Sequence, residues 1–395
     1  MYGDQNVFVK GHMINEADVD DDVVWTLPMR GKCDYEPGLC INTAFRHLSL
    51  SMLLNPHFHL QTYLRIKMLA LILICFILLF VTGLIVIRRQ FRTLKIKKRE
   101  DLYVMITGCD SGFGNLLAKH LDTLGMNVFA GCLTKKGGED LKKATSNRVL
   151  IIDLDVTNSE SVAEAFETVT ARLPHGRGLW GLVNNAGIFG QSCFVANDWL
   201  SIDDYKSVMA VNLYGTIEMT RTFLTLIRKE KGRIVNTTSV SGRVAIGGTP
   251  YICSKYAAEG FSDSLRTELW KSGITVHIIE PSGYKTNFCS GEGIIENLEK
   301  RYRELDQEKR EYYGEDFVQK LASQMDFDGN MSSNLNEVIE AYTHALTARF
   351  PKARYVVGWD ANTLYRFLWT APEWLSSFLL SRSWPTPRGV LQQQM

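Results

Sequence analysis

An uncharged run of twenty residues, from Met68 to Ile87, is the feature that most constrains how this chain can fold. It reads MLALILICFILLFVTGLIVI, and at about 1.5 Å per residue a helix of this length just crosses a hydrocarbon core of about 30 Å. A cleaved signal peptide is the alternative, but 67 residues precede the run and no small-residue cleavage site follows it. The sequence therefore predicts one transmembrane helix over residues 67–88.

The charges on either side of this run predict its orientation. The residues before it include an acidic cluster at 18–22, whereas those after it are rich in bases, namely Arg88, Arg89, Arg92, Lys95, Lys97, Lys98 and Arg99. The positive-inside bias places the larger C-terminal part in the cytosol, and we expect the endoplasmic reticulum as the membrane. Asn330-Met331-Ser332 is a possible glycosylation acceptor that would report the opposite orientation, whereas Asn236-Thr237-Thr238 lies on an expected buried strand.

Composition excludes several classes of protein. With 45% hydrophobic and 22% charged residues, the chain is not collagen-like, wholly disordered or disulfide-dense. Its net charge of +1 gives no field for binding nucleic acid. Eight cysteines without a CxxC pair or a metal-ligand spacing favour a reducing compartment and no metal site. Residues 1–66 show no sustained period, so we expect this segment to be disordered, and Cys33 and Cys40 would pair only if it were lumenal.

The chain from residue 100 onward alternates short apolar runs with amphipathic stretches of helical length. This alternation predicts βαβ units around a parallel sheet, as in a Rossmann-type doubly wound α/β fold, and a single domain over residues 100–395. The expected strands are Leu102–Ile106, Val128–Cys132, Val149–Leu154, Leu182–Asn184, Ile234–Asn236, Val276–Ile279 and Tyr355–Val357.

A glycine-rich turn follows the first expected strand and opens a helix. It reads Thr107-Gly108-Cys109-Asp110-Ser111-Gly112-Phe113-Gly114. Gly108 permits the tight turn, Gly112 lets the backbone approach a pyrophosphate at the helix N-terminus, and Gly114 allows the helix to pack against the strand. This strand, turn and helix predict a nucleotide-binding site.

The spacing T-G-x-x-x-G-x-G resembles the short-chain dehydrogenase/reductase family, and further matches follow in that family's order. Four segments of the sequence resemble the retinol and hydroxysteroid dehydrogenase branch of this family. They are TGCDSGFG, GLWGLVNNAG at 178–187, EGFSDSLRTEL at 259–269 and ARYVVGWDA at 353–361. The resemblance implies a catalytic tetrad of Asn212, Ser239, Tyr251 and Lys255. It also implies that the cofactor is bound by Thr107, Gly108, Asp110, Ser111, Gly112, Phe113, Gly114, Asp155, Val156, Asn185, Ala186, Gly187, Tyr251, Lys255, Pro281, Gly283 and Thr286.

Interconversion of an alcohol and a carbonyl needs a group that moves the hydroxyl proton near neutral pH. A free tyrosine, with a pKa of about 10, is too weakly ionised. Lys255, one helical turn from Tyr251, can place a positive charge beside the phenolate, so the resemblance makes Tyr251 the general acid or base. Ser239 would hold the substrate oxygen, and Asn212 would support a water relay to Lys255.

One departure from the family concerns the loop after the sixth strand. The family's Pro-Gly becomes Pro281-Ser282-Gly283 here, so the backbone beside the nicotinamide is expected to differ, although Thr286 keeps its spacing. The expected cofactor is NAD, because no Arg or Lys stands just before Gly112 to bind a 2′-phosphate. Lys135 and Lys136, after the second strand, keep NADP open.

Two segments concern the substrate and the membrane. Residues 288–330 correspond to the family's substrate lid, and their apolar positions would either cover a steroid or retinoid or pack as core. Residues 364–381 are aromatic, short and interrupted by Pro372, which suits an interfacial membrane contact better than a second span.

The expected function is that of a membrane-anchored, NAD-dependent oxidoreductase for a hydrophobic alcohol of the retinol or hydroxysteroid class. A dehydrogenase of a small hydroxy acid such as 3-hydroxybutyrate is one alternative, and a cofactor-binding scaffold without turnover is another. The expected partners are a hydrophobic small molecule and the membrane, with no nucleic acid, and a homodimer is left open.

Overall fold

The protein is described by a computed structural model that covers residues 56–96, 98–190, 194–286, 288, 291–324 and 331–393. The chain forms two units, Met1–Gly83 and Leu84–Met395. Among the described residues one helix, α2 (Pro56–Thr93), is long and apolar enough to cross a membrane, with the candidate span at Leu60–Thr93. Residues 56–66, which we expected to belong to a disordered segment, are therefore helical. Cys33, Cys40 and Asn330 lie outside the described residues.

The second unit is built on a parallel sheet of seven strands in the order β3-β2-β1-β4-β5-β6-β7. This order confirms the doubly wound fold, because the chain runs outward from β1 in one direction and then from β4 in the other. Each strand overlaps an apolar run expected from the sequence, although β1 begins one residue later than expected and β3 ends one residue earlier. They are β1 (Tyr103–Thr107), β2 (Asn127–Cys132), β3 (Val149–Asp153), β4 (Gly181–Asn184), β5 (Arg233–Thr237), β6 (Thr275–Pro281) and β7 (Arg354–Val357).

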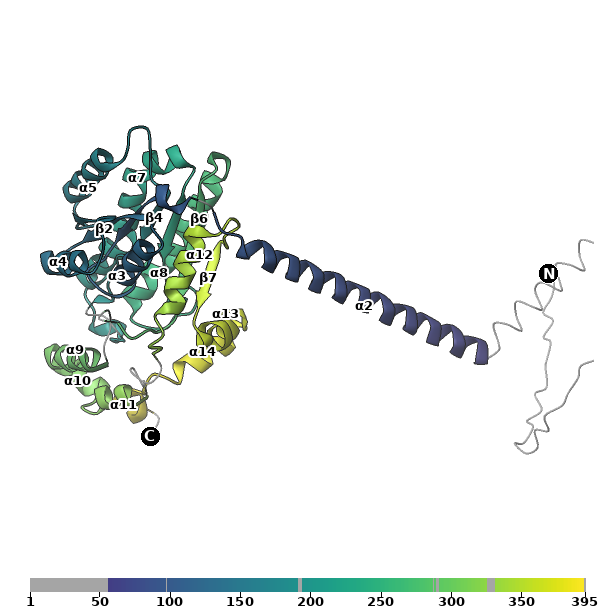
Figure 1. Ribbon diagram of the computed structural model, residues 1–395. Coiled ribbons are helices and arrows are strands. Elements are labelled where there is room, and N and C mark those ends of the chain that lie inside the picture. Colours follow the sequence, from purple (N-terminus) through teal and green to yellow (C-terminus); the bar gives the residue numbers. More distant parts are fainter. Residues whose placement is uncertain are drawn as a thin grey trace, which may run out of the picture. The chain divides into compact units, whose positions relative to one another are not determined.

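Helices cover both faces of the sheet (Figure 1). On one face α3 (Gly112–Thr123), α4 (Lys135–Lys143) and α12 (Asn336–Thr347) bury Leu117, Leu141 and Tyr342 in one apolar core against the sheet. On the other face lie α5 (Ser159–Arg172), α7 (Thr216–Glu230) and α8 (Thr249–Leu269), which bury Met219 and Phe223 together with Met105 of β1. Both faces are apolar, so the strands read as continuous rather than alternating hydrophobic runs.

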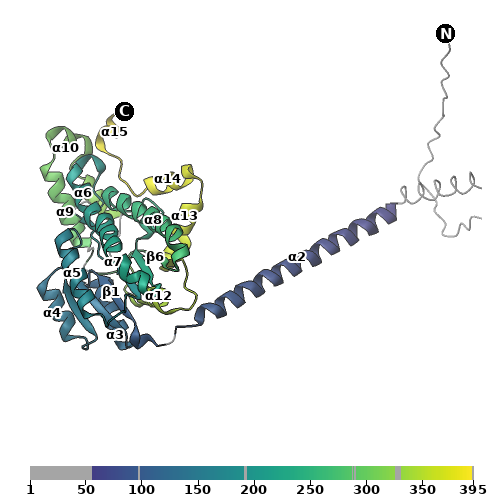
Figure 2. The same ribbon diagram turned by 90° about the horizontal axis from the view of Figure 1, so that it is seen from above.

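A third group of helices lies beyond the sheet. It comprises α9 (Gly291–Glu304), α10 (Gln307–Tyr313) and α11 (Phe317–Gln324), which are drawn together in Figure 1. The C-terminal elements are α13 (Arg366–Thr370), α14 (Glu373–Ser381) and α15 (Arg388–Gln393). In Figure 2 α15 lies next to α10, where a Cβ on Gly389 would stand 2.5 Å from the ring of Tyr312. The remaining helix, α6 (Ile202–Met209), leads into a π-helical turn, Ala210–Gly215, before α7.

The end of α2 and the residues after it pack against other parts of the second unit, to which they belong. Ile96 N donates to Thr347 O over 2.8 Å, and Arg349 N donates to Leu94 O over 2.6 Å. Phe91 meets Phe350 edge to face, and His344 Nε2 lies 3.0 Å from Arg92 O. These contacts attach residues 91–96 to the C-terminal end of α12.

Candidate active site

The glycine-rich turn joins β1 to the N-terminus of α3 as expected from its sequence. Gly108 and Gly112 both have positive φ, +70° and +60°, which residues with a Cβ rarely adopt. A Cβ on Gly114 would lie 2.3 Å from Gly108 O, so only glycine lets the helix pack this closely. The Ser111 side chain makes no capping bond to the helix it precedes. The first turn of α3 is therefore shaped to take an anion on its N–H groups.

Asn185 fixes this turn from the neighbouring strand. Its side-chain amide donates to Thr107 O over 2.9 Å and to Gly108 O over 3.0 Å. In return Thr107 Oγ1 accepts from the backbone N–H groups of Asn185 and Ala186. The expected residues at the ends of β1 and β4 therefore form one rigid unit beneath the cofactor site, and their direct contact with a cofactor stays a prediction.

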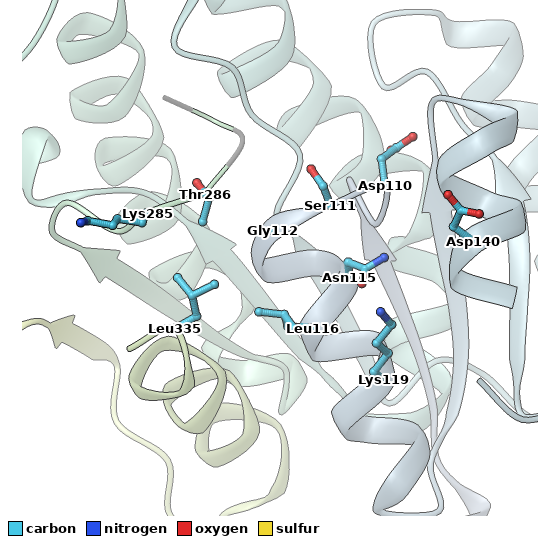
Figure 3. Close-up of a pocket in the computed structure, with 10 residues that line it drawn as sticks. All are labelled: Asp110, Ser111, Gly112, Asn115, Leu116, Lys119, Asp140, Lys285, Thr286 and Leu335. Atoms are coloured by element: carbon cyan, nitrogen blue, oxygen red, sulfur yellow. The ribbon is translucent and has the colours of Figure 1, made fainter. Parts of the chain in front are cut away.

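The carboxylate of Asp110 points away from α3, toward the loop after β2 (Figure 3). It accepts hydrogen bonds from Leu133 N at 2.9 Å and from Thr134 N at 2.7 Å, and a third from the Thr134 hydroxyl. A Cβ on Gly137 would stand 2.7 Å from Asp110 Oδ1, so glycine at the start of α4 makes room for this carboxylate. Asp110 thus shapes the loop where the ribose of a dinucleotide is expected.

Asp155 and Val156 lie just after β3 rather than on it. Asp155 Oδ1 accepts from Thr157 N at 2.9 Å and so closes a turn. Val156 is buried, and its Cγ2 would stand 2.7 Å from a Cβ on Gly215. Their side chains therefore stabilise the turn next to the π-helical segment, while their contact with a cofactor stays a prediction.

A cavity of about 420 Å³ opens at the N-terminus of α3 (Figure 3). Its walls come from the glycine turn, from α3 and α4, and from the loop after β6. The lining residues are Asp110, Ser111, Gly112, Asn115, Leu116, Lys119, Asp140, Lys285, Thr286 and Leu335. The cavity brings Ser111, Gly112 and Thr286 together as expected. Lys119 and Lys285 were not foreseen, because a lone lysine carries no local signal of a phosphate site.

The loop after β6 accommodates Ser282 because a glycine, Gly358, directly follows β7. A Cβ on Gly358, whose φ is +117°, would stand only 2.2 Å from Ser282 Oγ. Ser282 N also donates to Val357 O over 3.0 Å. The side chain that replaces the family's glycine therefore fits because Gly358 leaves space for it, and Gly283 and Thr286 continue the loop to the cavity.

Asn212 lies in the π-helical turn and binds the loop after β4. Its Oδ1 accepts from Ile188 N at 2.8 Å, and its Nδ2 donates to Ile188 O at 2.9 Å and to Ser254 Oγ at 3.0 Å. A Cβ on Gly187 would stand 3.3 Å from Asn212 Oδ1 and 3.7 Å from Lys255 Nζ. Two expected tetrad residues, Asn212 and Lys255, therefore both lie next to Gly187.

Lys255 is buried, and its Nζ donates to Thr237 O over 3.1 Å. Burial lowers the pKa of this amine to about 8, and the charge of Glu259 opposes that shift. Its Nζ lies 5.4 Å from the centroid of the Tyr251 ring. The helix α8 places both residues on one face, one turn apart, as their spacing predicts.

Ser239 lies two residues after the end of β5 and caps the N-terminus of a 3₁₀ turn, Val240–Gly242. Its hydroxyl donates to Pro281 O over 3.4 Å and accepts from Ser241 N at 3.1 Å. The hydroxyl is therefore oriented by the end of β6, so the structure places it at the carboxyl edge of the sheet with Lys255 and Thr237.

Aromatic rings surround Tyr251, which sequence reasoning missed. Phe189 stacks on the Tyr251 ring with centroids 4.1 Å apart and planes inclined by 12°. Phe288 meets the same ring edge to face at 6.0 Å. The two phenylalanines stand almost one hundred positions apart along the chain, so no local pattern could have joined them.

The helices of the expected lid pack against the segment that precedes α6. Ile294, Leu298 and Phe317 are buried in a small core with Trp199, which lies in the loop before α6. Tyr302, Tyr313 and Phe317 all meet the Trp199 ring. The sequence left two explanations open for these apolar positions, namely that they cover a ligand or that they pack as core. Core packing accounts for this buried set.

Comparison with known proteins shows which family the chain belongs to. The sequence profile named short chain dehydrogenase matches residues 102–292. Retinol dehydrogenase 7 of Rattus norvegicus is 46% identical over 305 residues, which cover 77% of this chain and 95% of that protein. The chain belongs to the short-chain dehydrogenase family. The bovine (Bos taurus) 17-beta-hydroxysteroid dehydrogenase type 6 is 43% identical over 308 residues, covering 77% of this chain and 96% of that protein.

Solved structures of short-chain dehydrogenases share the fold. One from Streptomyces avermitilis aligns with a TM-score of 0.54 at 24% identity, over 71% of this chain and 98% of that one. Another, from Burkholderia cenocepacia in complex with NADP, gives 0.52 at 22% identity, over 71% and 97%. This short-chain dehydrogenase is an oxidoreductase that acts on alcohols with a nicotinamide cofactor, and the resemblance to the retinol and hydroxysteroid branch is confirmed.

Proposed function

We propose that the protein interconverts a hydroxyl and a carbonyl group on a hydrophobic substrate of the retinol or hydroxysteroid class, with Tyr251 as general acid or base. The observation that carries this proposal is the surroundings of Tyr251. The Lys255 amine lies on one side, 5.4 Å from the ring centroid, and the Phe189 ring stacks on it at 4.1 Å. A tyrosine set between a cation and an apolar wall suits proton transfer to a hydrophobic alcohol.

The remaining roles follow from what each side chain contacts. Ser239, whose hydroxyl donates to Pro281 O before substrate binds, would turn that proton to the substrate oxygen. Lys255 stabilises the phenolate of Tyr251 by its charge, and Asn212 holds the loop after β4 against Ser254 in α8. The nicotinamide, when bound, supplies or accepts the hydride, and the glycine turn and Thr286 fit its pyrophosphate through the N-terminus of α3.

NAD is the cofactor that we propose. The Asp110 carboxylate lies at the loop after β2 and would repel the 2′-phosphate of NADP, and Ser111 supplies no compensating positive charge just before Gly112. Lys135 and Lys136 are exposed at the start of α4. They would have to turn toward the ribose for NADP to be preferred.

We make two further proposals about how the protein meets the membrane. We place the protein in the endoplasmic reticulum with the second unit in the cytosol, because the basic cluster follows the candidate span. We also place residues 364–381 at the membrane interface. Their helices α13 and α14 hold five and nine residues, too few to cross a bilayer. Trp374 and Phe378 are 71% and 55% exposed, as interfacial aromatic side chains are.

The test is NADH formation by membranes that contain the wild type, Tyr251→Phe or Tyr256→Phe. Each is supplied with NAD and a panel of retinols, 3- and 17-hydroxysteroids and 3-hydroxybutyrate. Tyr256 is a matched control, because it lies on α8 but is 45% exposed. We expect turnover of a hydrophobic alcohol that Tyr251→Phe abolishes and Tyr256→Phe retains.

Two results would overturn the proposal. Turnover of 3-hydroxybutyrate alone would make the protein a dehydrogenase of a small hydroxy acid. Cofactor binding without turnover of any panel member, with NAD and with NADP, would make it a scaffold.

A further inference from the structure

The turn that carries Ser239 is attached to the end of β6 at two points. One is the bond from the Ser239 hydroxyl to Pro281 O. The other is an ion pair in which Arg243 Nη2 donates to Glu280 Oε1 over 3.0 Å, and Glu280 directly precedes Pro281. Within the turn, Gly242 N donates to Ser239 O and Arg243 N donates to Val240 O, both over 2.9 Å. A shift of Arg243 would therefore be transmitted to Ser239.

Breaking the ion pair between Glu280 and Arg243 would be costly. Its side chain is wholly buried, and Oε1 also accepts from Arg354 Nη1 of β7 at 2.7 Å. Arg354 is itself shared with Glu259 and Asp263 of α8. Among the described residues, Glu280 Oε2 and Arg243 Nε have no hydrogen-bond partner. A buried carboxylate is costly without a paired cation, so Arg243 and Arg354 together hold the charge balance behind the active site.

The other side of Arg243 contacts the C-terminal segment. Its guanidinium carbon lies 5.6 Å from the ring centroid of Trp369 in α13. Arg366 lies over the same ring at 5.6 Å, but its only described side-chain hydrogen bond is to Asn362. The neighbouring Leu368 is buried, whereas Phe367 is 50% exposed. Trp369 thus connects the surface proposed to meet the membrane with the ion pair at Glu280.

We infer that Arg243 is a positioning residue for Ser239 and that Trp369 holds Arg243 in place, so that the C-terminal segment is coupled to the catalytic serine. The inference rests on the proposed role of Ser239. When α13 is displaced, Arg243 loses its aromatic support, the turn at 239–243 loosens, and the substrate oxygen is held less well.

The experiment uses the full chain in phospholipid vesicles and the panel alcohol that the wild type oxidises, unlabelled and deuterated at the carbinol carbon. We expect Arg243→Leu to lower kcat by about tenfold or more, because a small misplacement of a reacting group costs rate steeply. The KM for NAD should stay within about twofold, and the deuterium isotope effect should rise because hydride transfer becomes slower.

Matched variants separate positioning from packing. Arg243→Lys keeps the charge and should recover part of the kcat that Arg243→Leu loses. Trp369→Phe keeps an aromatic ring and should have the kcat of the wild type. Trp369→Leu removes the ring and should lower kcat as Arg243→Leu does. Arg366→Leu removes the second arginine from the same ring without touching Glu280, and should leave kcat and the isotope effect unchanged. If Arg243→Leu does not fold, Arg243→Lys and Trp369→Leu carry the test.

The inference is wrong if the Arg243 and Trp369 variants keep the wild-type kcat. It is equally wrong if they lose activity only in proportion to the number of NADH-binding sites, with KM and isotope effect unchanged, since that pattern marks a loss of folded protein. The proposed function fails separately, if Ser239→Ala or Tyr251→Phe retains full turnover.

Discussion

The amine of Lys255 donates a hydrogen bond to the carbonyl oxygen of Thr237, 3.1 Å away, and this bond joins α8 to the end of β5 two residues before Ser239. Burial of the same amine away from water favours its neutral form and lowers its pKa to about 8, although the charge of Glu259 opposes the shift. The folded protein therefore gives up stability to keep a charge beside Tyr251.

Replacing this lysine should separate stability from activity. Below pH 8 the amine is charged in both folded and unfolded chains, and its burial costs on the order of 3 kcal/mol. The folded protein releases the proton near pH 8 and the unfolded chain near 10.5, so wild-type stability rises across that window. We expect Lys255→Met to abolish turnover, to raise Tm at pH 7, and to lose that advantage between pH 8 and 10.5.

Thermal unfolding of both proteins over this pH range is the measurement. Lys271→Met, at an exposed position just after α8, is the control and should follow the wild type throughout. A Tm difference between Lys255→Met and wild type that does not change with pH would contradict the prediction.

Phe189 should set the preference for hydrophobic alcohols. An aromatic stack contributes about 0.5–1.5 kcal/mol, the upper end of which is about tenfold in rate or binding. Because Phe189 covers the Tyr251 ring, we expect Phe189→Ala to lower kcat/KM for the hydrophobic panel alcohol by about tenfold and that for 2-butanol by much less. Trp270→Ala, at a 75% exposed ring, is the control. Equal losses on both alcohols would mean that Phe189 only supports the tyrosine.

Cofactor choice should respond to charge at position 111. Ser111 stands at the mouth of the cavity with an uncapped helix behind it. We expect Ser111→Arg to raise the ratio of kcat/KM for NADP to that for NAD by about tenfold, because a guanidinium binds a 2′-phosphate well. Ser111→Ala should leave the ratio unchanged. A wild type that already prefers NADP would refute the NAD proposal.

The pair Ser282 and Gly358 should behave as one unit. A Cβ at 358 would clash with Ser282 Oγ, and φ of +117° strains any residue with a side chain. We expect Gly358→Ala to lower the free energy of unfolding by about 1–3 kcal/mol and to raise the KM for NAD, since the loop lines the cavity. Adding Ser282→Gly should recover part of both, because it removes the clash but not the backbone strain. A double-mutant cycle with no coupling would show the contact to be unimportant.

The sequence predicted the strands well because a parallel sheet buried on both faces needs apolar runs. The expected Val128–Cys132 lies inside β2, which begins one residue earlier, at Asn127. The glycine turn was equally readable, since positive φ at Gly108 and Gly112 requires those residues locally. Such features depend on neighbours along the chain.

What the sequence did not predict depends on contacts between distant segments. The hydrogen bond that Asp110 accepts from Thr134 N turns an expected cofactor ligand toward the neighbouring loop. The ion pair between Arg354 and Glu280 forms only when β7 lies beside β6, and nothing near Arg354 indicates that register. The lid was ambiguous because an apolar helix face looks the same against a ligand as against Trp199.

Asn236 occupies the middle of the sheet, 1% exposed, and its side-chain amide donates to Ser262 Oγ over 2.9 Å while its oxygen accepts from Asn184. The tripeptide Asn236-Thr237-Thr238 is nevertheless a sequon. In a nascent chain translocated into the lumen, Asn236 would be accessible for glycosylation before β5 could pair with β4 and β6. A glycan on Asn236 would then prevent β5 from joining the sheet. Biosynthesis and folding are thereby linked: on the cytosolic side the sequon is harmless, and on the lumenal side it would be a source of misfolded protein.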